Sequence, residues 1–217
     1  MIEKKTCCIF CPVWDINESK LRQAVKQPAL FIAADSGIAS MEALGFIPDV
    51  IIGDLDSAPL ALLSEPKYKD IPRIIHPTEK DDTDLMLAVK YALDNGCRDI
   101  IIIGGIGGRL DHTLANLMIL EYIHKRNAAG TITDGKTKVR YLSGDSLEVR
   151  RGYKYISLIP LREHVNGITL TGFDYPLDNA CLSMSEPYTV SNRLADGQEC
   201  GIISVSGGAV LVVECDE

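Results

Sequence analysis

Residues 99–112 read Asp-Ile-Ile-Ile-Ile-Gly-Gly-Ile-Gly-Gly-Arg-Leu-Asp-His, and this stretch decides the fold class. Four consecutive isoleucines are β-branched and leave no polar face, which predicts a strand over residues 99–104 that is buried on both sides. The glycines end the strand, and the pattern over residues 111–125 predicts a long helix. A buried strand, a glycine-rich turn and a helix in this order are typical of an α/β domain.

The same alternation of short apolar runs and helical patterns extends back to the N-terminus. Further strands are predicted at residues 6–12, 30–34, 50–53 and 73–76, and further helices at residues 18–26, 38–44 and 84–94. The last of these helices ends in Asn95-Gly96, which is a favourable C-terminal cap. We therefore expect a doubly wound, mostly parallel sheet with helices on both faces.

The pattern changes after about residue 130, where short apolar runs separated by turn signals replace the helices. The runs are residues 138–142, 146–150, 153–159, 168–171, 199–205 and 209–214. This spacing predicts an antiparallel β-sandwich. We expect an α/β domain over residues 1–135 and an all-β domain over residues 136–217, with the hinge near residues 134–137.

Composition restricts the possible partners. The chain has 217 residues, of which 46% are hydrophobic and 24% charged, as in a folded protein of one large or two modest domains. Its net charge of -8 argues against nucleic acid or an anionic membrane as the main partner. The sequence shows neither a membrane-spanning stretch nor a signal peptide, and its seven cysteines lack a paired zinc pattern. We expect a cytoplasmic protein with free thiols.

Aspartates follow two neighbouring predicted strands. Asp35 comes directly after the strand at residues 30–34, and Asp54 and Asp56 come after the strand at residues 50–53. Ligands of open α/β sheets bind at the carboxyl ends of the strands. In an extended segment Asp54 and Asp56 point the same way, and Mg²⁺ would relieve the repulsion between their carboxylates. The structural alternatives are a helix cap at Asp35 and a solvated turn at Asp54.

A third acidic cluster, Asp81-Asp82-Thr83-Asp84, precedes the predicted helix at residues 84–94. Acidic residues in a first helical turn complement the helix dipole, and one aspartate together with Thr83 suffices for that purpose. Three carboxylates exceed this need. We therefore expect at least Asp84 to bind a metal ion or a ligand.

The turn at residues 104–109 has the features of a phosphate site. Its glycines let the backbone approach a phosphate closely, and Arg109 supplies a forked cation. It lacks the Lys-Ser/Thr ending of a P-loop and the regular spacing of a dinucleotide site, which disfavours both. His112 and Asp111 suggest a base and its orienting group, but a capping Asp111 beside a His112 that faces the ligand or packs is equally consistent with the sequence. Carboxylates for a cation beside a turn for phosphate suit phosphoryl-type transfer.

These motifs closely resemble those of the thiamine pyrophosphokinase family. The shared pattern comprises residues 34–37, Pro48-Asp49, residues 52–57, residues 80–84 and residues 104–112, in the same order and with the same spacing. The match spans about residues 31–120 and continues more weakly at residues 167–172 and 175–177. The resemblance implies an α/β nucleotide-binding domain, a C-terminal β-sandwich, and a homodimer that binds thiamine where the two subunits meet.

The resemblance also implies roles for individual residues. The expected ligands of Mg²⁺ are Asp54, Asp56 and Asp84. The residues expected to engage ATP are Asp35, Asp81, Thr83, Gly107, Gly108, Arg109 and His112. The pair that corresponds to the thiamine-contacting Ser-Asn of the family is Ser191-Asn192. The expected catalytic residues are Asp54, Asp84 and Asp111, with Asp111 or a magnesium-bound carboxylate as the proton acceptor.

The chain departs from the family pattern at three places. Ser36 replaces the first glycine of a pair, and Arg193 stands where an acidic residue is frequent. The segment at residues 11–14 lacks the usual Asn-Gly turn, so no role is expected there.

The implied reaction is attack by the hydroxyethyl oxygen of thiamine on the β-phosphorus of ATP, with AMP leaving. Three alternatives remain open from the sequence. The first is transfer to another acceptor, such as a hydroxymethyl-pterin. The second is a Mg²⁺-dependent phosphatase with Asp54 as nucleophile, and the third is a non-catalytic nucleotide-binding or thiamine-sensing module.

Overall fold

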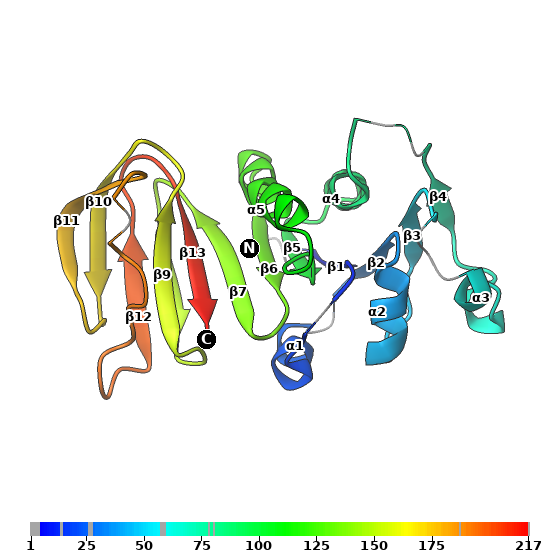
Figure 1. Cartoon of the computed structure of the whole chain (residues 1–217), viewed down its shortest axis with the longest axis horizontal. Helices are drawn as coiled ribbons and strands as arrows, with labels where there is room; N and C mark the ends of the chain where they lie inside the picture. The colour runs from blue at the N-terminus through cyan, green and yellow to red at the C-terminus, as the bar shows by residue number, and fades with distance from the viewer. Residues whose placement is uncertain are drawn as a thin grey trace. The chain divides into compact units, whose positions relative to one another are not determined.

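The computed structural model describes residues 5–13, 15–25, 28–56, 60–77, 79, 81–186 and 188–216. Four residues of the sequence patterns, Trp14, Lys26, Ser57 and Lys80, lie outside the described residues. The chain divides into two compact units, Met1–Gly135 and Lys136–Glu217, and Figure 1 shows the elements of each.

The first unit is built on a sheet of parallel strands. In spatial order these are β4 (Arg73–Ile75), β3 (Val50–Gly53), β2 (Leu30–Ala34), β1 (Thr6–Phe10), β5 (Asp99–Ile103) and β6 (Ala129–Thr133). The chain runs outward from β1 to β4, then returns to the other side of β1 with β5 and β6. This reversal creates a topological switch point between β1 and β5, where ligands of such sheets bind.

Helices cover both faces of this sheet, as the sequence predicts. The helices are α1 (Glu18–Ala24), α2 (Gly37–Leu44), α3 (Leu60–Leu63), the 3-10 turn η1 (Pro66–Tyr68), α4 (Asp84–Asp94) and α5 (Leu110–Lys125). Figure 1 shows α4 and α5 on one side of the strands and α1 and α2 on the other. Asn17 caps α1 by accepting a hydrogen bond from the Lys20 amide, and Gly96 ends α4 at φ 82°. No helix in the described residues has the length and apolarity needed to cross a membrane.

The core of the first unit includes a cluster of aromatic rings. The Phe10 ring centroid lies 5.3 Å from that of Phe46, and Phe31 lies 5.5 Å from Phe46. Phe10 is fully buried in β1, where it also packs with Ile38 and Met41 of α2. Aromatic pairs at such spacing contribute about 1 kcal/mol beyond their buried area. This packing fixes the ends of β1 and β2, which position the site described below.

The second unit is a β-sandwich of antiparallel strands. In one layer of this unit, neighbouring hydrogen-bonded strands are β7 (Thr137–Leu142), β13 (Val210–Cys215) and β9 (Tyr155–Pro160). The other consists of β11 (Leu177–Ser183), β10 (His164–Thr171), β12 (Cys200–Ser204) and β8 (Ser146–Arg150). Buried side chains of both sheets, such as Val212 of β13 and Ile168 of β10, form a single apolar cluster. The sandwich predicted from the sequence is therefore confirmed.

Two strands are absent from the sequence-based prediction. In β6, Gly130 interrupts the apolar pattern, and an added Cβ there would lie 2.9 Å from the Leu120 side chain of α5. The glycine thus permits close helix-to-strand packing. The strand β11 lies at the edge of its sheet and reads Leu-Asp-Asn-Ala-Cys-Leu-Ser, so it lacks the apolar alternation of a half-buried strand. All seven cysteines are free thiols, as expected.

A buried ion cluster joins β7 to β13 in the second unit. Glu214 is fully buried, and its carboxylate lies 2.9 Å from Lys138 Nζ and 2.6 Å from Arg140 Nη2. Lys138 stands directly opposite Glu214 in the strand register. Breaking a buried ion pair by removing one partner is strongly destabilising, because the remaining charge loses its counter-charge.

We expect Glu214→Gln to lower the free energy of unfolding by about 3 kcal/mol, because the buried group that pairs with two half-buried cations loses its charge. Urea unfolding followed by far-ultraviolet circular dichroism measures the loss. The control is Glu148→Gln, whose carboxylate pairs with Arg150 at the surface and should change stability by about 0.5 kcal/mol or less. Equal losses in the two variants would contradict a stabilising role of the buried cluster.

Candidate active site

The predicted site residues of the first unit lie at the carboxyl edge of its parallel sheet. Asp35 follows β2, Asp54 and Asp56 follow β3, and the glycine turn at residues 104–108 follows β5. Because all these strands run in the same direction, their carboxyl ends share one edge. The switch point between β1 and β5 lies on the same edge.

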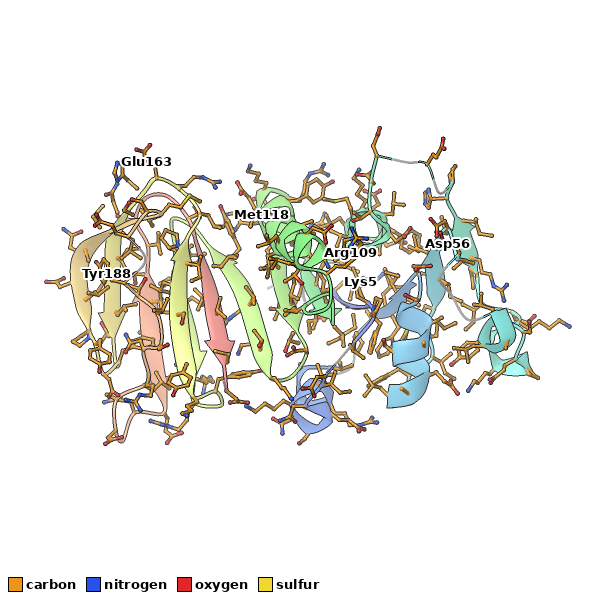
Figure 2. The ribbon with its side chains drawn as sticks, viewed as in Figure 1. Lys5, Asp56, Arg109, Met118, Glu163 and Tyr188 are labelled. Carbon is orange, nitrogen blue, oxygen red and sulfur yellow. The ribbon has the colours of Figure 1, made fainter. Side chains whose placement is uncertain are left out.

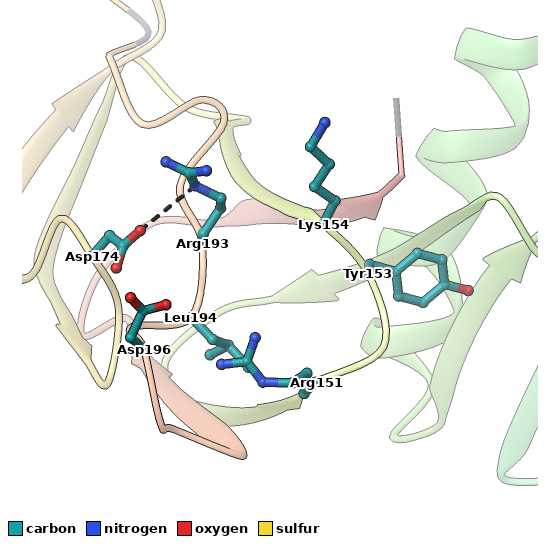
Figure 3. A pocket seen from close by; sticks show the side chains of 7 residues that line it. All are labelled: Arg151, Tyr153, Lys154, Asp174, Arg193, Leu194 and Asp196. Atoms are coloured by element: carbon teal, nitrogen blue, oxygen red, sulfur yellow. Dashed lines mark ion pairs between the residues drawn. The ribbon is translucent and has the colours of Figure 1, made fainter.

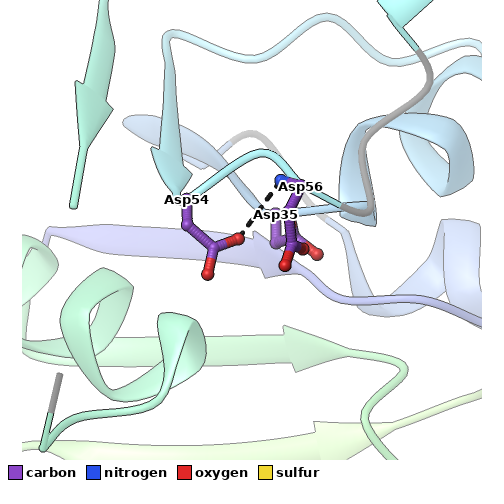
Figure 4. Close-up of side chains that lie close together, drawn as sticks. All are labelled: Asp35, Asp54 and Asp56. Carbon is purple, nitrogen blue, oxygen red and sulfur yellow. Dashed lines mark hydrogen bonds between the residues drawn. The ribbon is translucent and has the colours of Figure 1, made fainter. Parts of the chain in front are cut away.

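Three carboxylates gather at this edge. One ligand oxygen each from Asp35, Asp54 and Asp56 lies within 4.8 Å of the other two, and Figure 4 shows the three side chains together. The Asp56 amide donates a 3.2 Å hydrogen bond to Asp54 Oδ1. Asp35 and Asp54 are half-buried, and Asp56 is exposed. This is a compact set of hard oxygen donors of the kind that Mg²⁺ prefers.

The convergence of Asp54 and Asp56 is as predicted, but its geometric basis is different. Leu55 has φ 60°, so the segment is kinked and not extended. Asp35 also has positive φ, at 47°. A leucine in the left-handed region is unusual, and strained residues of this type cluster at functional sites. Gly53 adds a close approach, since a Cβ at that position would lie 3.1 Å from Asp35 Cα.

Asp35 has the most perturbed electrostatic environment of the cluster. Burial raises the pKa of its carboxyl, and the charges of Asp84, Asp54 and Asp56 raise it further, against a lowering by the Ser36 amide. Its Oδ1 is buried and, among the described residues, has no hydrogen-bond partner. A cation bound by Asp35 and its neighbouring carboxylates would stabilise the charged form of Asp35.

At the start of α2, the adjacent positions 36 and 37 differ in whether they require glycine. Ser36 has φ -65° and ψ -3°, an ordinary helical conformation that any residue can adopt. Gly37 is different, because a Cβ there would lie 1.9 Å from the Phe10 carbonyl oxygen. Serine therefore fits at position 36 without backbone strain, whereas position 37 requires glycine.

The third acidic segment has mixed roles. The Thr83 hydroxyl accepts the Met86 amide at 3.2 Å and thereby caps α4, while Asp82 forms an ion pair with Lys90. Asp81 is exposed and Asp84 is half-buried. Asp84 is outside the group of three carboxylates, although its charge acts on Asp35.

The glycine turn that follows β5 has a left-handed backbone. Gly104, Gly105, Gly107 and Gly108 have φ values of 80°, 73°, 91° and 64°. Residues with a side chain rarely adopt such φ values, so this backbone conformation requires glycine. At Gly104 a Cβ would also lie 2.6 Å from the Pro12 carbonyl oxygen.

Arg109 and Asp111 form an exposed ion pair at the start of α5. Arg109 Nη2 lies 2.6 Å from Asp111 Oδ2, and the His112 amide donates to Asp111 Oδ1 at 3.0 Å. The hydrogen bond from Arg109 lowers the pKa of Asp111 to about 2. A group with this pKa is a weak base at neutral pH, which argues against the expected role of Asp111 as proton acceptor. Both carboxylate oxygens of Asp111 accept hydrogen bonds from the Arg109 guanidinium.

Ser191 and Asn192 lie in the second unit and differ in exposure. Asn192 is 6% exposed, and its side-chain amide accepts from the Tyr175 N–H at 3.1 Å and donates to the Tyr175 carbonyl at 2.9 Å. Ser191 is exposed and has φ 59°. A small cavity of about 70 Å³ is lined by Leu170, Tyr175, Leu177, Tyr188, Thr189, Val190 and Asn192. Ser191 thus has a hydroxyl at the surface, whereas the amide of Asn192 is used inside the protein.

A larger cavity of about 300 Å³ in the second unit was not predicted from the sequence. Figure 3 shows its lining residues, Arg151, Tyr153, Lys154, Asp174, Arg193, Leu194 and Asp196. Arg193 Nε lies 3.6 Å from Asp174 Oδ2, and Arg151 donates to the carbonyls of Ala195 and Gln198. Among the residues that line this cavity, Arg193 stands out in the sequence as a departure from the family pattern. The other lining residues are brought together by folding, so their positions in the sequence do not indicate a cavity.

Comparison with known proteins identifies what the chain resembles. Two family models match: "Thiamin pyrophosphokinase, catalytic domain" at residues 21–132 and "Thiamin pyrophosphokinase, vitamin B1 binding domain" at residues 146–210. The thiamine pyrophosphokinase of Bacillus subtilis (strain 168) is 30% identical over 191 residues, which cover 85% of this chain and 86% of the relative.

Solved structures agree with this likeness. The crystal structure of thiamine pyrophosphokinase from Bacillus subtilis superposes with a TM-score of 0.85 at 28% identity, covering 98% of this chain and 100% of that chain. The thiamin pyrophosphokinase from Geobacillus thermodenitrificans gives a TM-score of 0.81 at 29% identity, covering 98% and 97%. The Candida albicans protein, at 17% identity and a TM-score of 0.79, shares the fold over 99% of this chain and 90% of its own.

We expect Asp111 to titrate at about pH 2 in carbon-13 NMR of the side-chain carboxyl. Because the folded-state pKa is depressed, the stabilisation from this pair is present above the ordinary pKa of 3.8 and is lost as the pH falls toward 2. Arg109→Gln should return the titration toward 3.8, whereas Arg150→Gln, which breaks a different exposed pair, should not. A wild-type Asp111 that titrates near pH 4 would show that the ion pair does not persist in solution.

Proposed function

Because the chain belongs to the thiamine pyrophosphokinase family, whose members are ATP:thiamine diphosphotransferases, we propose that its carboxyl-edge site carries out this transfer. The thiamine hydroxyl oxygen bonds to the β-phosphorus of ATP while the bond to the bridging oxygen of AMP breaks. The observation that supports this site is the gathering of Asp35, Asp54 and Asp56 at the sheet edge to which the glycine turn also belongs.

The three carboxylates fit Mg²⁺. They supply hard oxygen donors within 4.8 Å of one another, and the buried Asp35 Oδ1 has no hydrogen-bond partner among the described residues. We assign Asp54 and Asp56 as ligands, as the sequence predicts, and add Asp35. Asp84, whose Oδ1 is also buried, stays a predicted ligand, and its charge favours a cation nearby. When bound, Mg²⁺ supplies neutralisation of phosphate charge and orientation of the phosphate oxygens.

The glycine turn and Arg109 are assigned to the phosphates of ATP. The left-handed glycines allow close approach of the backbone, and the exposed guanidinium is held by Asp111. Charge that develops on the transferred group is stabilised by such preorganised donors. Further residues assigned to ATP are Asp81, Thr83, Gly107, Gly108 and His112. The Thr83 hydroxyl caps α4, so Thr83 is assigned to ATP by its position at the start of that helix.

The thiamine hydroxyl needs little help to lose its proton in a loose transition state. Asp111 is disfavoured as the acceptor by its low pKa of about 2. A carboxylate of the acidic cluster is therefore the better proton acceptor, and the binding of both substrates in line supplies most of the rate enhancement.

We assign Ser191 to direct contact with thiamine and Asn192 to holding the loop that presents it. Asn192 does so through its two hydrogen bonds with the backbone of Tyr175. A homodimer agrees with the exposed apolar side chains of both units. On α5 these are Leu110, Leu114 and Met118, which recur every four residues, and in the second unit they include Tyr175 and Tyr188. Figure 2 labels Met118 and Tyr188.

Family membership does not favour the alternatives of a pterin acceptor or a phosphatase. Mass spectrometry after incubation with ATP separates a phosphatase from direct transfer, because only a phosphatase with Asp54 as nucleophile forms an aspartyl-phosphate.

We expect the wild-type protein to convert thiamine and ATP to thiamine diphosphate and AMP in equal amounts when Mg²⁺ is present, as measured by liquid chromatography. Asp54→Asn should lower kcat at least about a hundredfold, since it removes a charged ligand of the cation that neutralises the phosphates. The matched control is Asp70→Asn, the same change at an exposed turn residue of the same unit. Full activity in Asp54→Asn would refute the assignment, as would formation of ADP in place of AMP.

We expect sedimentation equilibrium to give twice the mass of one chain. Leu114→Glu should shift the protein toward monomer, because it places a charge on the apolar face of α5, where Leu114 is 52% exposed. Lys125→Glu, at the far end of the same helix, is the control for an added carboxylate. A monomeric wild-type protein at micromolar concentration would overturn the dimer proposal.

A further inference from the structure

Two side chains of α5 hydrogen-bond to the glycine turn at residues 104–108. The first is Thr113, whose hydroxyl accepts the Gly107 N–H at 3.2 Å and lies 3.1 Å from the Gly107 carbonyl oxygen. The same hydroxyl lies 3.2 Å from the carbonyl oxygen of Arg109. A hydroxyl has one proton to donate, so the carbonyls of Gly107 and Arg109 share it. Thr113 thereby links both backbone groups of Gly107 to the first turn of the helix.

The second side chain is Asn116, whose Nδ2 donates to the Gly105 carbonyl oxygen at 2.8 Å. Residues 113 and 116 are three apart on α5 and therefore lie on the same helix face. The contact at Gly105 is close, since a Cβ at that position would lie 3.1 Å from Asn116 Nδ2. The face of α5 that meets the turn thus holds it at two points, Gly105 and Gly107.

The turn needs such contacts because of its composition. Gly104, Gly105, Gly107 and Gly108 all have positive φ, and glycine backbones lose more conformational entropy on ordering than those of any other residue. Gly107 and Gly108 are exposed, so packing contributes little to their order. The side-chain hydrogen bonds from α5 compensate for this by restricting the turn to one conformation.

We propose that Thr113 and Asn116 are positioning residues that fix the turn in the conformation that receives the phosphates of ATP. Neither residue contacts the nucleotide in this proposal, and both act through the backbone of Gly105 and Gly107. The inference rests on the proposed function, in which this turn binds ATP. An ordered turn binds phosphate more tightly because the cost of ordering is met on folding and not on binding.

A purely structural role is the rival explanation. A threonine hydroxyl that bonds to the carbonyl four residues earlier is common within helices and affects the helix alone. Such a role would change thermal stability and would affect both substrates alike. A positioning role instead changes the affinity for ATP and leaves the affinity for thiamine unchanged.

The test uses Thr113→Val, which keeps the shape of the side chain and removes the hydroxyl. We expect KM for ATP to rise about tenfold with KM for thiamine unchanged, which corresponds to the loss of the two contacts to Gly107. Asn116→Asp should act in the same direction, because a carboxylate oxygen then faces the Gly105 carbonyl oxygen. Thr113→Ser restores the hydroxyl and should recover most of the affinity for ATP. The matched control is Thr171→Val, the same chemical change at an exposed residue of β10.

Direct titration of each protein with ATP and Mg²⁺ in a calorimeter distinguishes failure of this inference from failure of the proposed function. If the wild-type protein binds ATP but forms no thiamine diphosphate, the proposed function fails, and the comparison of dissociation constants still tests the two residues. If Thr113→Val melts at a lower temperature but binds ATP as tightly as the wild type, the role is structural and the inference is wrong. Failure of Thr113→Ser to recover ATP binding would also overturn it.

Discussion

Electrostatic repulsion among three carboxylates at one edge of a parallel sheet is the constraint on which the other features of the site depend. Ligand oxygens of Asp35, Asp54 and Asp56 lie within 4.8 Å of one another, and two unit charges at that distance repel by about 3.5 kcal/mol at an effective dielectric constant of about 20. The strands β2 and β3 oppose this repulsion with their hydrogen bonds and buried isoleucines. The strained backbone at Asp35 and Leu55 is a second cost at the same place. In the proposed function, a cation bound by these carboxylates offsets their repulsion.

Most of the fold could be predicted because its signals are local. The isoleucines of β5 and the cap at Gly96 identify their elements without reference to distant residues. The strand β6 could not be predicted in this way, because Gly130 is explained only by the side chains of α5 that pack against it. The edge strand β11 could not be predicted either, since its partner supplies the hydrogen bonds that its own polar sequence does not suggest.

The sequence predicted which site residues lie close together better than it predicted the hydrogen-bond partner of each polar atom. Spacing along the chain brought Asp54 and Asp56 together correctly, although the positive φ at Leu55 replaced the extended geometry on which the prediction relied. The sequence could not reveal that the hydroxyl of Thr83 and the amide of Asn192 are already bonded within the protein. Nor could the sequence show that Arg109 forms an ion pair with the carboxylate of Asp111. A motif specifies residue types, whereas three-dimensional packing decides which lone pairs and protons remain for a ligand.

The backbone at the start of α2 constrains two adjacent positions unequally. At position 36 the backbone is ordinary, so natural drift can exchange glycine for serine without moving the main chain. At position 37 even a methyl group would overlap the carbonyl of Phe10, and that carbonyl belongs to the central strand of the sheet. In a survey of relatives, we therefore expect variety at the first position and near-uniform glycine at the second.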